Sequence, residues 1–85
     1  MSAANLHARV IARRFQVSSG YTHWMNEGES RAIRAILGGT AKAADMRVLE
    51  QMLRGHPGFN TPVTAEELRA ERGRKALTAL AKAGA

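Results

Sequence analysis

Apolar residues recur every three or four positions along most of the chain, which is the period of an amphipathic α-helix. The first such segment predicts a helix from about Ala4 to Phe15, followed by a turn over Gln16–Gly20. The apolar side of this helix carries Leu6, Val10 and Ile11, and the polar side carries Arg9, Arg13 and Gln16.

The middle of the chain predicts two further helical segments. One covers Tyr21–Leu37, either continuous or interrupted near Asn26–Glu29, where the first and last residues have capping spacing. Gly38 and Gly39 should end it. The next helix should begin at a Thr40 cap and stop at Gly55 and Pro57. Its apolar stripe would consist of Ala44, Val48, Leu49, Met52 and Leu53.

A loop over residues 55–63 then leads into the strongest local signal in the chain. Thr64 and Glu67 have the spacing of a capping box, and Val63 and Leu68 have that of a hydrophobic staple. We therefore expect a helix from Ala65 to Gly84, either continuous or bent at its polar, glycine-containing middle over residues 71–75.

These segments predict an all-α fold, a compact bundle of four to five short helices that contains a helix-turn-helix-like pair. Residues 1–85 should form one small helical domain, with frayed ends at residues 1–3 and 84–85. A chain of this length buries a thin core, so we expect a homodimer to supply further burial.

Charge adds a statement about partners. Thirteen Lys and Arg residues against seven Asp and Glu give a formal net charge of +6. Residues 1–26 contain Arg9, Arg13 and Arg14 and no acidic residue. Because guanidinium groups suit bidentate contact with phosphate and guanine edges, this balance favours a nucleic-acid partner over a merely solvated basic surface.

Several classes of protein are disfavoured. The chain contains no cysteine and no apolar run long enough to cross a bilayer, so we expect a cytoplasmic protein that does not enter the membrane. His7, His23 and His56 lack partners at ligand spacing, which predicts that no metal is bound. Without a phosphate loop or a catalytic constellation, we expect no enzyme, no cofactor and no small-molecule substrate.

Residues 8–27 are similar to the helix-turn-helix motif of DNA-binding regulators, of the small phage or plasmid repressor type. The motif requires a small residue at its fifth position, which Ala12 supplies, and Gln16 stands where glycine is usual. Its five apolar positions are filled here by Ile11, Phe15, Val17, Thr22 and Met25. The alternative is that these are ordinary core residues of a helical hairpin.

The resemblance implies a mechanism of operator occupancy. Ser18 would cap the recognition helix, and Arg13 and Arg14 would reach phosphates. Arg9, Arg31 and Arg34 would add phosphate affinity. The residues that would face base edges are Ser19, Gly20, Tyr21 and His23.

The C-terminal segment looks like the helical part of a winged-helix domain, through the run from Met46 by way of Thr64–Leu68 to Ala76–Gly84. Under that resemblance Arg72, Arg74 and Lys75 would enter the DNA groove. The alternative is that these cations form the solvated face of one long helix.

Two further functional classes stay open. One is a small helical inhibitor or adaptor, for example phage-encoded, that binds a host protein through Tyr21 and Trp24, since aromatic residues and arginine dominate interface energetics. The other is an RNA-binding protein that uses the same two rings for base stacking.

Overall fold

The computed structural model describes residues 3–22 and 24–84 and confirms the all-α fold. Within these residues the helices are α1 (Ala3–Thr22), α2 (Glu27–Gly38), α3 (Ala43–Gly55), the short 3-10 helix η1 (Pro57–Phe59) and α4 (Ala65–Gly84). Ala3 and Gly84, which were expected to fray, are helical, and residues 1, 2 and 85 lie outside the described residues. No described helix is long and apolar enough to cross a membrane.

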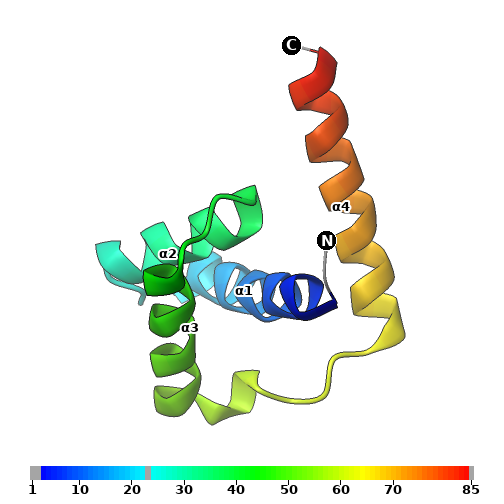
Figure 1. The fold of residues 1–85 in the computed structure, drawn as a ribbon. Helices are drawn as coiled ribbons and strands as arrows, with labels where there is room; N and C mark the ends of the chain where they lie inside the picture. The colour runs from blue at the N-terminus through cyan, green and yellow to red at the C-terminus, as the bar shows by residue number, and fades with distance from the viewer. Residues whose placement is uncertain (1–2, 23, 85) are drawn as a thin grey trace.

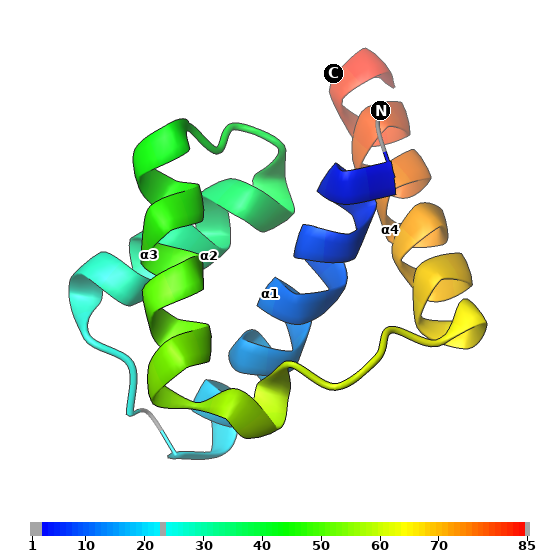
Figure 2. The same cartoon turned by 60° about the horizontal axis from the view of Figure 1, so that its bottom comes forward.

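Helix α1 lies between two parts of the molecule, with α2 and α3 on one side and α4 on the other (Figures 1 and 2). Its most buried residues are Ile11, Ala12 and Phe15, which are at most 2% exposed. They meet an apolar layer from the next two helices, formed by Ile33, Ile36, Leu37, Leu49 and Met52. The core therefore lies among the first three helices.

An aromatic cluster closes one end of this core. Phe15 stacks on Phe59 with ring centroids 4.3 Å apart, and Trp24 tilts against His56 at 4.6 Å. The indole Nε1 of Trp24 donates a hydrogen bond to Ser18 Oγ at 3.1 Å. Because its ring is packed and its N–H has an acceptor, Trp24 acts as a core residue here.

The turn predicted over Gln16–Gly20 is wrong, because α1 continues through this segment to Thr22. The polar side chains that suggested a turn bond within the helix instead. Ser19 Oγ donates to the carbonyl of Gln16 at 3.1 Å, which is the back-bonding compatible with a continuing helix. Ser18 consequently lies inside α1 and does not cap a second helix.

The other helix ends follow the sequence signals with one exception. Asn26 and Glu29 form the expected capping box, and Gly39 adopts a left-handed conformation with a φ of 80° at the end of α2. Thr40 does not cap α3: its N–H donates to the carbonyl of Ala35 at 2.9 Å, so it completes α2. Lys42 occupies the N-cap position instead, where its backbone N–H donates to the side chain of Asp45. Helix α3 then begins at Ala43.

At the last helix the box of Thr64 and Glu67 forms as predicted, with both reciprocal hydrogen bonds at 3.1 Å. Helix α4 starts at Ala65 and runs without a break through Gly73. Its distal half extends beyond the rest of the molecule (Figure 1).

The aromatic cluster yields a stability prediction. Phe15→Ala should lower the free energy of unfolding by about 3 kcal/mol or more, because it leaves a cavity where a fully buried ring contacts both Phe59 and Trp24. Val17→Ala, at a 54% exposed position of the same helix, should change it by less than ~0.5 kcal/mol. Urea unfolding followed by circular dichroism measures both, and equal losses in the two variants would contradict this placement of the core.

Candidate nucleic-acid interface

The three N-terminal arginines that the sequence assigns to phosphate contact all have partners inside the protein. Arg9 is 3% exposed. Its NH1 group donates to the carbonyls of Leu37 at 2.6 Å and Ile36 at 3.4 Å, so it satisfies the C-terminal end of α2. Its NH2 group lies 3.1 Å from Glu71 Oε1. Arg9 therefore ties α1 to both α2 and α4 from a position that solvent barely reaches.

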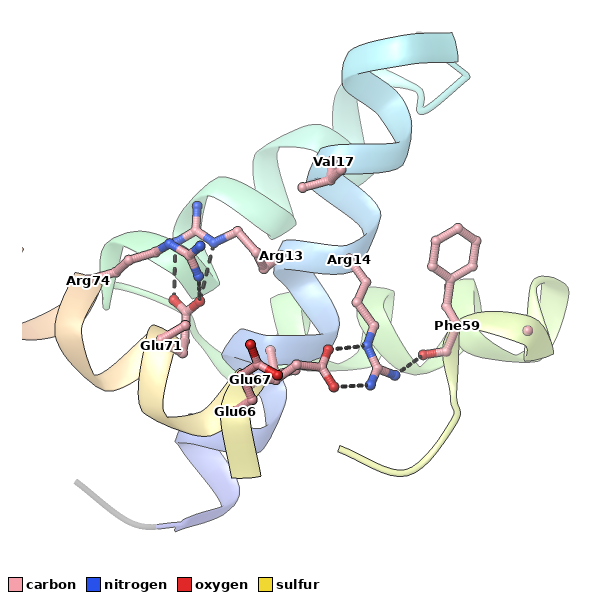
Figure 3. A pocket seen from close by; sticks show the side chains of 11 residues that line it. Arg13, Arg14, Val17, Phe59, Glu66, Glu67, Glu71 and Arg74 are labelled. Carbon is pink, nitrogen blue, oxygen red and sulfur yellow. Dashed lines mark hydrogen bonds and ion pairs between the residues drawn. The ribbon is translucent and has the colours of Figure 1, made fainter. Parts of the chain in front are cut away.

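Glu71 is the focus of this network. Its side chain is 1% exposed and contacts three guanidinium groups, those of Arg9, Arg13 and Arg74. Arg13 donates from Nε at 3.2 Å and from NH2 at 3.0 Å in a bidentate fork, and Arg74 donates at 3.0 Å from the next turn of α4 (Figure 3). A buried carboxylate is tolerated only when it is paired in this way.

The ionisation of Glu71 follows from these contacts. Burial acts to raise the pKa of the carboxyl, but the hydrogen bonds and charge of Arg13, together with those of Arg74 and Arg9, outweigh it. The pKa of Glu71 consequently lies below its ordinary value. Glu71 is therefore an anion surrounded by three guanidinium groups, and these four side chains together carry a net positive charge.

Arg14 forms a second junction with α4. Its guanidinium makes a bidentate pair with Glu67 at 2.8 and 2.7 Å. It also donates to the carbonyl of Phe59 (Figure 3) and to those of Thr61 and Pro62, so it shapes the loop that leads into α4. The hydrogen bond from Arg14 and the one from the Thr64 backbone lower the pKa of Glu67 to about 2.

A groove lies where α1, η1 and α4 meet, with a volume of about 610 Å³. Its apolar lining comes from Val10, Val17, Phe59 and Ala70. The charged lining consists of Arg13, Arg14, Arg74, Glu66, Glu67 and Glu71 (Figure 3). Three cations and three anions balance, so the groove offers little net attraction for a polyanion. The described residues contain no cluster of three or more potential metal-ligating His, Asp or Glu side chains.

The remaining predicted contact residues are scattered. Arg31 is exposed and lies 3.7 Å from Glu27, and Arg34 is exposed on the same helix, α2. Ser19 is half-buried on α1. The side chain of Tyr21 and the whole of His23 lie outside what the structure describes. The described part of the chain thus does not gather the predicted set into one surface.

A basic face is found instead on α4. Arg69 and Arg72 are exposed one turn apart, and the half-buried Lys75 follows at the same spacing. Glu67 and Glu71 of the same helix turn toward α1, where the arginines engage them. Arg72 and Lys75 were among the predicted DNA contacts, and Arg69 was missed although it precedes Arg72 by the same three residues. The sequence does not reveal which side of α4 is covered, and that side decides which cations are exposed.

The pKa of Glu67 predicts an acid transition. A carboxylate whose folded-state pKa is depressed contributes stability that is present above pH ~4.5 and is lost as the pH falls toward about 2. Because the side chain is one-third exposed, we expect a loss of roughly 1–2 kcal/mol over this window. Urea unfolding of Glu67→Gln between pH 6 and pH 2 should show a shallower pH dependence than Glu66→Gln, its exposed neighbour. Parallel profiles would contradict the assignment.

Glu71 predicts a large loss on neutralisation. Glu71→Gln leaves Arg9 buried without its anion and should lower the free energy of unfolding by about 3–5 kcal/mol. Replacing both partners, as Arg9→Met with Glu71→Leu, should cost less than the sum of the single changes, because no buried charge then lacks a partner. Additive losses in this cycle would show that the two groups are uncoupled.

Comparison of the chain with models of protein families, with curated proteins and with solved structures finds no match in any of the three. A function for this chain therefore rests on two features of its structure. Three arginines hold α4 against α1, and α4 turns a basic face outward.

Proposed function

We propose that the protein binds double-stranded DNA through the outward face of α4 and regulates transcription by occupying an operator site on that DNA. The observation that carries the proposal is the pair of exposed cations Arg69 and Arg72, followed by Lys75, on a helix whose carboxylates Glu67 and Glu71 are engaged on another side. This separation leaves a row of cationic groups, two guanidiniums and one ammonium, available for phosphates and base edges.

The shape of α4 favours a duplex. Its distal half extends away from the other helices (Figure 1), and Arg69 and Arg72 are exposed on its first half, so the outer side of α4 is open to DNA. An α-helix fits the major groove of B-form DNA, whereas the major groove of an RNA duplex is too narrow for side chains to read. From residue 72 to residue 82 the sequence contains no acidic residue that would repel the phosphate backbone.

Single-stranded RNA is the less favoured ligand because binding to it depends on aromatic side chains that bases can stack on. Phe15, Trp24 and Phe59 pack against one another instead. Trp24 is half-buried in that cluster, which also removes it as a prominent anchor for a protein partner.

The N-terminal arginines have a supporting role in this proposal. Arg9, Arg13 and Arg14 hold α4 in place through Glu71 and Glu67, and a phosphate could recruit them only by displacing these carboxylates. A continuous α1 also lacks the turn on which the helix-turn-helix resemblance depends. DNA contact is therefore assigned to α4.

Fluorescence anisotropy with a labelled random duplex at low and moderate salt tests the proposal. Arg69→Ala with Arg72→Ala should weaken binding about tenfold or more and reduce the salt slope by ~2, because each phosphate contact contributes ~0.9 to that slope. The helical content should not change, since both side chains are exposed.

Arg47→Ala with Arg54→Ala is the matched control, because it removes the same charge from exposed positions of α3. An equal loss in both double variants would show that net charge alone drives binding, and no binding at low salt would overturn the proposal. Stronger binding of an RNA competitor than of duplex DNA would assign the face to RNA.

A further inference from the structure

Helix α4 carries an apolar stripe that the described residues leave uncovered. Ala70, Gly73, Leu77 and Leu80 follow one another at intervals of three, four and three residues, which places them along one side of the helix. All four are exposed, and Leu77 and Leu80 are each 70% exposed. The alternating spacing is that of a helix seam that packs against a second helix, so we call these four residues the α4 seam.

The seam runs between the two other sides of α4, and its first residue, Ala70, also lines the groove toward α1. Glu67 and Glu71 face α1, and Arg69 and Arg72 lie on the outer, basic side. The distal half of α4, which bears both leucines, extends beyond the other helices (Figure 1). Within the described residues the glycine of the seam has no atom within 4 Å of the position that a Cβ would occupy, so close approach there is open.

We propose that the α4 seam binds the α4 seam of a second copy of this chain, with the two helices antiparallel. The sizes of the seam residues favour the antiparallel orientation. One half of the seam is small, Ala70 and Gly73, and the other half is large, Leu77 and Leu80. An antiparallel pair places Leu80 opposite Ala70 of the other copy and Leu77 opposite Gly73, so each large side chain meets a small one.

Charge supports the same arrangement. Glu66 is exposed one turn before Ala70, at the start of α4, whereas residues 72–84 contain four cations and no carboxylate. Antiparallel packing brings this acidic start next to the cationic end of the other copy, whereas parallel packing would align the two cationic ends. Arg74 flanks the seam near the two-fold axis, but its guanidinium is paired with Glu71 at 3.0 Å.

The dimer has a consequence for DNA binding, which rests on the function proposed above. Two antiparallel helices related by a two-fold axis normal to their common plane present corresponding sides in the same direction. The basic sides of both copies, each with Arg69 and Arg72, would then form one continuous surface. Such a surface doubles the number of phosphates that a single complex can contact.

Analytical ultracentrifugation of the protein alone, from ~5 to ~500 μM, tests the dimer without DNA. Because one helix seam covers less than the ~800 Å² per partner of a standard interface, we expect a reversible dimer that dissociates in the micromolar range. Leu77→Glu with Leu80→Glu should give a monomer at every concentration with unchanged helical content. Val17→Glu, at an exposed apolar position outside the seam, should leave the dimer intact.

The orientation can be tested by disulfide formation, since the chain contains no cysteine of its own. When Ala70→Cys and Leu80→Cys variants are mixed and oxidised, the antiparallel arrangement predicts mainly the mixed disulfide between the two variants. Predominant like-with-like disulfides would indicate parallel helices and overturn the proposal.

Two results of the ultracentrifugation would also overturn it: a monomer throughout the range, and a dimer that survives the leucine substitutions. A monomer that binds added anionic phospholipid vesicles through Leu77 and Leu80 would assign the seam to a membrane surface instead. Loss of DNA binding in Arg69→Ala with Arg72→Ala, while the dimer persists, would separate the two proposals. A persistent dimer without any DNA binding would support the dimer proposal and contradict the DNA-binding proposal.

Discussion

The arrangement of the helices depends on one buried carboxylate. Glu71 is 1% exposed and is surrounded by Arg9 and Arg13 from α1 and by Arg74 from its own helix. Through Arg9 the same network reaches the carbonyls at the end of α2. A carboxylate in this position requires every one of its oxygens to be paired, which allows α4 few alternative orientations against α1. The docking of α4 is thus fixed by charge at least as much as by apolar packing.

This dependence explains how the cations of the protein divide into two groups. The N-terminal arginines, which stand in a stretch of sequence without acidic residues, are balanced by Glu67 and Glu71 from more than fifty residues away. Their charge stabilises the fold. Within the described part of the chain, Arg69 and Arg72 make no such long-range ion pair, and they lie exposed on the outer side of α4. The chain has a net charge of +6, and its excess positive charge at the surface therefore comes from residues other than Arg9, Arg13 and Arg14.

Helix α4 combines three sides with different physical properties. One side binds α1 through ion pairs, one bears exposed arginines, and one bears the uncovered α4 seam. Among the side chains that the structure describes, none from the distal half of α4 belongs to the core of α1, α2 and α3. Arg69 and Arg72 lie in the first half of α4 and the two seam leucines lie in its distal half, so both halves have exposed residues for the two proposed roles, DNA contact and self-association. The two proposals use adjacent sides of one helix, so each can be tested by substitutions that leave the other side unchanged.

The sequence by itself determined most of the helix ends, although Thr40 does not cap α3 and no turn forms over Gln16–Gly20. The capping boxes of Asn26 with Glu29 and of Thr64 with Glu67, the left-handed end at Gly39 and the helical period all act over a few residues, and each formed as expected. Tertiary contacts decided the rest. α1 continues through Ser18 and Ser19, and Ser18 accepts a hydrogen bond from Trp24, which no local pattern reveals. The partners of Arg9, Arg13 and Arg14 likewise depend on which side of α4 meets α1, because an arginine in a sequence looks the same whether its ion pair is internal or with a ligand.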